Sequence, residues 1–218
     1  DLIHLVQKKE NISFAAGFCK ESLGPIAIGS KTTRKGADQH IKLKSIISFD
    51  LDFKDNVSEY KTSMREELTN SLSLKITETL ICHKIHLWMM VFSGNGLHLH
   101  FKLKTPYEIT SIKQYKNIYD SLRSYLECIT GLKFDPSCSN PSRLIRLPLS
   151  TNWKDLNSPV ACKVLSHNPS ADFSSVFANF NEMIEFRPLF EKKHIKDKQR
   201  ILSSLTLIKV LEYFSYSK

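Results

Sequence analysis

Two apolar segments joined by a four-residue turn constrain the fold of this chain more than any other feature. The segments are 85–92 (IHLWMMVF) and 97–104 (LHLHFKLK), and the turn between them is 93–96 (SGNG). An Asn-Gly turn between two such segments is typical of a β-hairpin, and strict alternation is typical of a strand with one buried face. The sequence therefore predicts a hairpin whose second strand is apolar on one face and carries His98, His100 and two lysines on the other.

The other predicted elements complete an α+β pattern. Helical periodicity runs through 56–80 and 112–129, and a basic helix is expected from about 195. Residues 132–154 are expected to be irregular. The remaining predicted strands are short: 12–18, 25–29, 45–53 and 158–167.

The order of these elements predicts a fold class. From residue 45 onward, a strand, a helix, a hairpin, a second helix and a last strand follow one another. This is the order of an RRM-like (ferredoxin-like) α+β sheet. Such a sheet packs its helices on one face and leaves the other face free for a ligand. The RRM-like module is expected to span 45–167 within a core of 1–190, and 191–218 is expected to lead to a further domain.

Length, charge and cysteine content narrow the function classes. The 218 residues can bury one sizeable core, and no apolar stretch approaches the roughly 20 residues of a membrane span. A net charge of +9 favours a polyanionic partner, with nucleic acid ahead of a membrane surface, although a lysine-rich proteome would give the same balance. Five scattered cysteines without a CxxC pair fit a reducing interior such as cytoplasm. The chain does not start with Met, so we expect a fragment of a longer protein.

Carboxylates supply the first candidate chemistry. In SFDLDF, alternation places Asp50 and Asp52 on one face of a strand and the apolar residues on the other. Two carboxylates on one face repel each other unless a cation lies between them, and Mg²⁺ or Mn²⁺ suits such oxygen ligands. The alternative is a solvated strand end. Asp135, between Phe134 and Pro136, is a third candidate, with a common Asp-Pro turn as its alternative.

Phosphate-binding chemistry is the second candidate, and it begins at the hairpin turn. Its two glycines and its backbone N–H groups allow a phosphate to approach closely. His98 lies nearest the turn on the face of the carboxylates, whereas His100 is expected to be a surface or supporting residue. A plain hairpin with solvated histidines is the alternative. The residues predicted to contact phosphate here are Ser93, Gly94, Asn95, Gly96 and His98.

A basic segment follows Asp135 and adds candidate phosphate ligands. SRLIRLPLSTNWK contains Arg143, Arg146, Asn152 and Lys154. Arginine binds phosphate through two N–H groups, and lysine adds a point charge. A basic loop without a function is the alternative. Carboxylates for metal followed by donors for phosphate describe a site for nucleotidyl transfer.

The order of these motifs resembles the archaeo-eukaryotic primase superfamily, in its primase-polymerase branch. FDLDF, SGNGLH, and FDPS with RLIRLPLSTNWK occur here in that family's order, over about residues 45–154. The resemblance implies an RRM-like catalytic sheet packed with an N-terminal αβ unit. One departure is Pro148-Leu149, where members often have Pro-Gly.

The resemblance also implies roles for the candidate residues. Asp50, Asp52 and Asp135 would hold two Mg²⁺ or Mn²⁺ ions. Single-stranded DNA template, primer and nucleoside triphosphates would be the partners of a monomeric core, in a prokaryotic, plasmid or viral setting. The implied triphosphate ligands are Ser93, Gly94, Asn95, Gly96, His98, Arg143, Arg146, Asn152 and Lys154.

Two other functions fit parts of the pattern. His98-Leu99-His100 resembles the His-hydrophobic-His motif of rolling-circle replication initiators and relaxases, in which a tyrosine attacks DNA. That function leaves the Asp50/Asp52 pair and the arginines without a role. The second alternative is a non-catalytic RRM-like module that binds nucleic acid.

Overall fold

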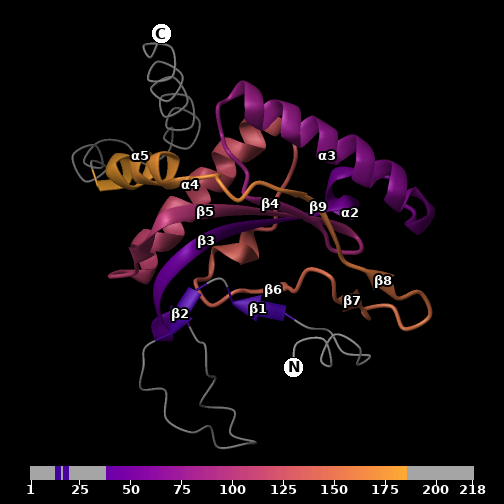
Figure 1. Cartoon of the computed structure of the whole chain (residues 1–218), viewed down its shortest axis with the longest axis horizontal. Coiled ribbons are helices and arrows are strands. Elements are labelled where there is room, and N and C mark those ends of the chain that lie inside the picture. The colour runs from indigo at the N-terminus through magenta and orange to yellow at the C-terminus, as the bar shows by residue number, and fades with distance from the viewer. Residues whose placement is uncertain (1–12, 16, 20–37, 186–218) are drawn as a thin grey trace, which may run out of the picture.

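A five-stranded antiparallel sheet forms the centre of the fold in the computed structural model, which describes residues 13–15, 17–19 and 38–185 (Figure 1). The two long strands pair along most of their length, with Asp50 opposite His98. The order of strands across the sheet is β2 (Gly17–Cys19), β3 (Ile41–Asp52), β5 (Gly96–Glu108), β4 (Met89–Phe92) and β9 (Lys163–His167).

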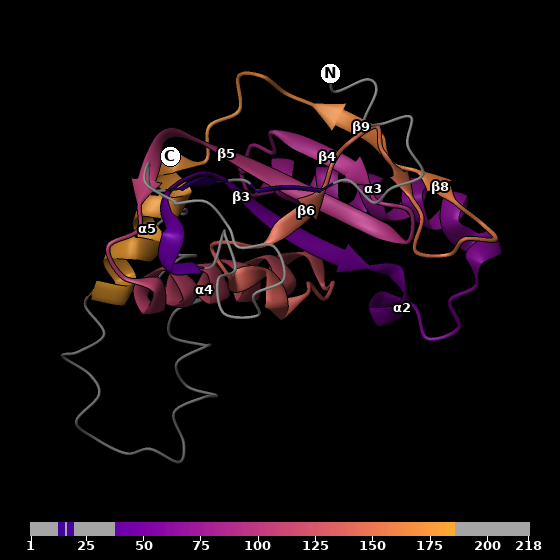
Figure 2. The same ribbon diagram turned by 90° about the horizontal axis from the view of Figure 1, so that it is seen from below.

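Helices and small sheets lie on opposite sides of the central sheet. In Figure 1, α3 and α5 lie above it, whereas β1, β6, β7 and β8 lie below. Figure 2, viewed from below, has β6 in front of β3. β1 pairs with β6, and β7 pairs with β8. The helices are α2 (Phe53–Asn56), α3 (Arg65–Cys82), α4 (Ile112–Thr130) and α5 (Ser174–Glu185), with 3₁₀ turns η1 (Asp38–His40), η2 (Thr62–Met64) and η3 (Pro136–Ser139); the small strands are β1 (Ser13–Ala15), β6 (Leu144–Arg146), β7 (Thr151–Asn152) and β8 (Val160–Ala161).

The core lies between the sheet and the helices, as alternation predicts. Phe49 of β3 stacks on Tyr119 of α4, with ring centroids 4.7 Å apart, and meets Phe101 of β5 edge to face. The hydroxyl of Tyr119 donates to the backbone oxygen of Ser48, which satisfies its polar group inside the core. The inward residues of the two long strands are all fully buried: Ile47, Phe49, Leu51, Leu97, Leu99 and Phe101.

The helix predicted over 56–80 begins later than expected. α3 begins at Arg65, because the residues after β3 first form the short helix α2. The last residue of α2, Asn56, donates from its amide to the backbone oxygen of Lys133 and accepts from the N–H of the same residue. Asn56 therefore ties the end of β3 to the segment that leads into η3. The helix predicted over 112–129 is α4, and Gly131, with a φ of 66°, is its C-cap.

The ferredoxin-like arrangement is confirmed only in part. The first three strands of the predicted module, β3, β4 and β5, take the expected antiparallel order with β5 in the middle. In a ferredoxin-like sheet the last strand lies beside the first, but here β9 pairs with β4 at the far edge and β2 pairs with β3. The fold is therefore a mixed α+β fold with an antiparallel sheet.

The other predicted strands and helices differ in how well they agree with the structure. The strand predicted over 158–167 is two strands, β8 and β9, which belong to different sheets. Sequence reasoning missed α5, which packs on α4 through the Tyr125–Phe180 ring pair. The strand predicted at 25–29, most of the N-terminal αβ unit and the C-terminal helix lie outside the described residues. Within the described part of the chain, no helix is both long and apolar enough to cross a membrane.

Candidate active site

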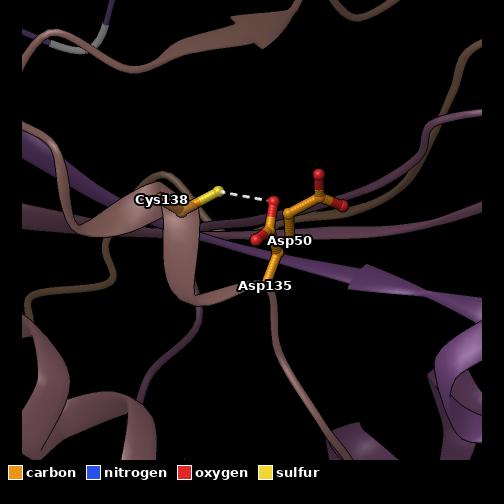
Figure 3. Close-up of side chains that lie close together, drawn as sticks. All are labelled: Asp50, Asp135 and Cys138. Atoms are coloured by element: carbon orange, nitrogen blue, oxygen red, sulfur yellow. Dashed lines mark hydrogen bonds between the residues drawn. The ribbon is translucent and has the colours of Figure 1, made fainter.

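Two carboxylates from distant parts of the sequence meet at the face of the sheet opposite the helices. Asp50 lies near the end of β3, and Asp135 lies directly before η3. The backbone N–H of Asp135 donates to the backbone oxygen of Asp50 at 2.8 Å, which fixes the two residues side by side. One carboxylate oxygen of each and Sγ of Cys138 all lie within 4.8 Å of one another (Figure 3).

Asp50 lies in surroundings that disfavour its charge. Burial, together with the neighbouring charges of Asp52 and Asp135, raises the pKa of its carboxyl to about 7. The guanidinium groups of Arg143 and Arg146 act in the opposite direction but do not compensate. The unliganded site therefore lacks positive charge, and a bound cation would supply it.

Asp135 is held ionised by its own segment. Burial acts to raise its pKa, but hydrogen bonds from the hydroxyl and N–H of Ser137 and the charge of Arg143 lower it below its ordinary value. The hydroxyl of Ser137 donates at 2.6 Å and Nη2 of Arg143 at 3.2 Å, both to Oδ2 of Asp135. The pKa values of the two close carboxyls are thus shifted in opposite directions, a pattern that is common at functional sites.

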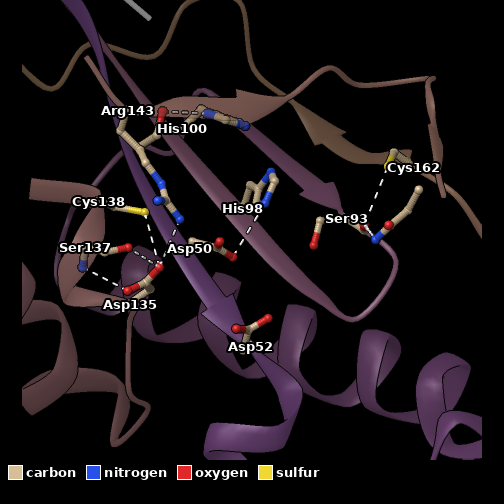
Figure 4. Close-up of polar contacts among 12 residues, drawn as sticks. Asp50, Asp52, Ser93, His98, His100, Asp135, Ser137, Cys138, Arg143 and Cys162 are labelled. Atoms are coloured by element: carbon tan, nitrogen blue, oxygen red, sulfur yellow. Dashed lines mark hydrogen bonds and ion pairs between the residues drawn. The ribbon is translucent and has the colours of Figure 1, made fainter. Parts of the chain in front are cut away.

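Asp52 shares the face of Asp50, as alternation predicts, but lies apart from Asp135 (Figure 4). Its carboxylate is about one third exposed and lies 3.8 Å from Nζ of Lys54. Among the described residues, the group able to hold a metal ion contains Asp50, Asp135 and Cys138 but not Asp52. Asp52 therefore lies outside the cluster, and its role as a metal ligand stays a prediction.

His98 lies beside Asp50, and His100, which was expected to be a surface or supporting residue, is buried. Nε2 of His98 is 3.5 Å from Oδ1 of Asp50. Burial, with the charges of His100, Arg146 and Arg143, lowers the pKa of His98 to about 3, so at neutral pH the ring is uncharged and the contact is not an ion pair. His100 is fully buried, and its Nδ1 shares a 2.8 Å hydrogen bond with Ser48. Strand alternation alone does not predict that both rings are buried.

The hairpin turn packs closely against neighbouring segments and is hydrogen-bonded to them. Gly94 has a φ of 109°, and an added Cβ there would lie 2.7 Å from the Asn152 amide nitrogen. At Gly96 a Cβ would lie 2.1 Å from the backbone oxygen of Leu51, so only glycine fits. The side-chain oxygen of Asn95 accepts from the hydroxyl of Tyr60 and from Arg65. The predicted phosphate contacts of these residues stay predictions.

The basic segment divides into anchoring and exposed residues. The buried amide of Asn152 donates to the backbone oxygen of Ser93 at 2.8 Å, and its oxygen accepts from the N–H of Lys154. Asn152 therefore holds the hairpin against β7. Arg143 contacts Asp135, and the charge of Arg146 acts on both Asp50 and His98. The side chain of Lys154 is exposed.

Sequence reasoning missed two residues of this region. Cys138 follows Asp135 by three residues in DPSC, and that spacing across a Pro-Ser turn was the available signal. Burial raises the pKa of its thiol to about 12, with the charge of Asp50 adding to the shift. Lys44, six residues before Asp50 on β3, is buried, and its Nζ donates to the backbone oxygen of Pro141. Nothing in its local sequence distinguishes it from a solvated strand lysine.

Comparison with known proteins gives one structural likeness. No protein-family model matches the chain, and no curated protein sequence matches it. A solved structure, the archaeo-eukaryotic primase (AEP) domain of the cyanophage S-2L primase-polymerase, is similar with a TM-score of 0.47 and 12% sequence identity. The similarity covers 78% of this chain and 69% of that domain. Likeness at this level does not establish a family for this chain.

Proposed function

We propose that this chain is a DNA-dependent primase-polymerase, a nucleotidyltransferase that joins nucleotides on a single-stranded DNA template. The observation that supports the proposal most is the meeting of Asp50 and Asp135 beside two arginines and a buried histidine. These residues come from the three motifs of the resemblance, which are far apart in sequence. A catalytic site for nucleotidyl transfer needs carboxylates for metal and donors for a triphosphate in the same place.

The donor set fits divalent metal ions. Two carboxylates from separate elements face each other, and burial and neighbouring carboxylates leave the charge of Asp50 uncompensated. Asp50 and Asp135 would hold one ion, and Asp52 on the same face would extend the set toward a second. Mg²⁺ or Mn²⁺ held by these residues would supply Lewis-acid chemistry for a 3′-hydroxyl and charge stabilisation for a leaving pyrophosphate.

The remaining side chains would orient the nucleotide. His98 is neutral, so it would act as a hydrogen-bond donor to a phosphate oxygen and not as a cation. Arg146 would supply charge to the triphosphate, and Arg143 would keep the Asp135 carboxylate in place. Lys154, which is exposed, would contact the phosphates or the template. With Asn152 and the turn residues, these are the nucleotide-binding residues that we propose.

A nucleotide-incorporation assay tests this function. The chain is incubated with single-stranded template, Mn²⁺ or Mg²⁺ and labelled nucleotides, with and without a primer. Asp135→Asn should abolish incorporation, because Asn cannot supply the charge that a metal ion needs. Asp55→Asn is the matched control, since Asp55 is exposed on α2 near the same strand end and lies outside the site. Wild-type activity in Asp135→Asn, or no incorporation by the wild-type chain, would refute the proposal.

The rolling-circle alternative finds less support in the site. Within the described ranges, the one group of side chains able to hold a metal contains neither His98 nor His100. His100 is instead fully buried, and its Nδ1 shares a hydrogen bond with the hydroxyl of Ser48. A covalent tyrosyl-DNA adduct would be the product of that mechanism, and its detection would favour the alternative.

A further inference from the structure

Cys138 is the member of the carboxylate cluster that the sequence motifs do not assign. Its Sγ lies within 4.8 Å of carboxylate oxygens of both Asp50 and Asp135, and its S–H donates to Oδ2 of Asp135 at 4.0 Å. The side chain comes from η3, where Asp135 is the N-cap and Cys138 the buried third residue. The fold thus directs a sulfur atom at the two oxygens proposed to hold a metal ion (Figure 3).

The distances suit one shared ion. Zinc-type ions bind sulfur at about 2.3 Å and carboxylate oxygen at about 2.0–2.2 Å in a tetrahedral shell, so two ligands of one ion lie roughly 3.5 Å apart. The three atoms need only a small closing movement to reach such a shell. Because thiolate is the form of cysteine that binds metal, the Cys138 thiol would release its proton to solvent when an ion binds.

A second, independent observation points to a ligand at this place. His98 is 95% buried (5% relative exposure), and its Nε2 faces Oδ1 of Asp50 at 3.5 Å, beyond the length of a good hydrogen bond. Its Nδ1 has no hydrogen-bond partner within the described residues. A buried ring nitrogen without a partner is the kind of group that a bound water, ion or ligand satisfies, and this ring lies directly beside the cluster.

We propose that Cys138 is a metal ligand, and that the cluster with Asp50 and Asp135 therefore selects a sulfur-accepting divalent ion such as Co²⁺ or Zn²⁺ over Mg²⁺. The inference rests on the proposed function for the identity of the site, and it adds the class of metal that the site takes. Mg²⁺ is a hard ion that prefers oxygen and retains water, whereas thiolate sulfur favours softer first-row metals. The alternative is a buried thiol that only packs beside the carboxylates.

Co²⁺ is the probe that separates these two cases, because a cobalt–thiolate bond gives an intense charge-transfer band in the near ultraviolet. Titration of the wild-type chain with Co²⁺ should produce this band, and Cys138→Ser should lose it. Cys162→Ser is the matched control, since Cys162 is also buried but donates to the backbone oxygen of Ser93. Cys128→Ser controls for binding at an exposed thiol.

Affinity gives a second readout. Cys138→Ser should weaken Co²⁺ and Zn²⁺ binding by calorimetry at least about tenfold, a typical loss when a metal site is perturbed. Mg²⁺ binding should change by less than about twofold. X-ray absorption of the cobalt-loaded wild-type chain reports directly whether sulfur lies in the shell, so the test does not depend on whether a variant folds. Absence of sulfur from the shell, or retention of the band in Cys138→Ser, overturns the inference.

The outcomes for metal choice and for activity are separable. If the shell contains sulfur but the chain incorporates no nucleotide with any metal, the metal site stands and the primase-polymerase proposal fails. If incorporation proceeds equally well with Mg²⁺ and Co²⁺ and the shell contains only oxygen and nitrogen, the function stands and the role of Cys138 fails.

Discussion

Replacing Asp50 by Asn should stabilise the protein when no metal is present. Burial and two neighbouring carboxylates raise the pKa of Asp50 from 3.8 to about 7. Between these two pH values the unfolded chain loses the proton while the folded chain keeps it, so the free energy of unfolding falls as pH rises. Below pH 3.8 both states are protonated and there is no cost. Above about pH 7 the cost is complete and constant.

The size of this effect follows from the shift. About three pKa units at 1.36 kcal/mol each set an upper limit of about 4 kcal/mol for the wild-type chain above pH 7. The side chain is 19% exposed, so water relieves part of the cost. We expect Asp50→Asn to gain about 1–3 kcal/mol at pH 8 after discounting for this screening. Asn avoids the cost because it has nearly the same shape and cannot ionise.

Urea unfolding at several pH values, with a chelator present, measures the gain. The stability difference between Asp50→Asn and wild type should be small at pH 4, grow up to about pH 7 and stay level above it. Asp55→Asn, an exposed neighbour, should show no such trend. Mn²⁺ should raise the melting temperature of the wild type but not of Asp50→Asn. A variant that is less stable than wild type at pH 8, or a gain independent of pH, would refute the reasoning.

Three further substitutions test the supports of the site. Gly96→Ala should destabilise the fold by about 3 kcal/mol or more in urea unfolding, because its Cβ would overlap the backbone oxygen of Leu51; a loss below about 1 kcal/mol would contradict this close approach. Burial lowers the pKa of the Lys44 amine in the folded state to about 8, so the free energy of unfolding of the wild type should rise between about pH 8 and pH 10.5. Lys44→Met should remove this rise, and an unchanged rise would show that another group causes it. Asn152→Ala should cost about 1–3 kcal/mol, because the backbone oxygen of Ser93 would lose its amide donor and keep only the weaker thiol donor of Cys162. Hydrogen exchange should quicken at the hairpin, and unchanged exchange would contradict the anchoring role.

The part of the site that lies within one strand was predictable from sequence. A period of two separates Asp50 from Phe49 and Leu51, and it places His98 on the same face once the hairpin is recognised. These statements need only the pleat of a strand and the register of a turn. The same reasoning does not predict how deeply the polar face is buried, because that burial depends on segments elsewhere in the chain. His100 is fully buried, although alternation places it on the face that was expected to be open.

Element boundaries depended on similar non-local contacts. Only the later part of the helix predicted over 56–80 forms, as α3 from Arg65. The side chain of Asn56 is hydrogen-bonded to the backbone of Lys133, and the chain turns between Asn56 and Arg65. The partner of a strand edge is equally non-local. β9 follows the second helix as the ferredoxin-like order requires, yet it pairs with β4 and not with β3. Sequence order specifies which elements exist, and it leaves open which edge a late strand joins.

Backbone hydrogen bonds explain why Asp50 lies beside Asp135 whereas Asp52 lies apart from it. The backbone oxygen of Asp50 accepts from the N–H of Asp135, so η3 meets β3 at residue 50. Two residues further along, the backbone oxygen of Asp52 accepts from the Asn56 amide of α2 instead. Asp50 therefore contacts both its own strand pair and the η3 segment, whereas Asp52 lies at the end of the strand with its carboxylate about one third exposed. Of the two carboxylates in the Asp-x-Asp motif, one is fixed within the protein and the other is open to solvent.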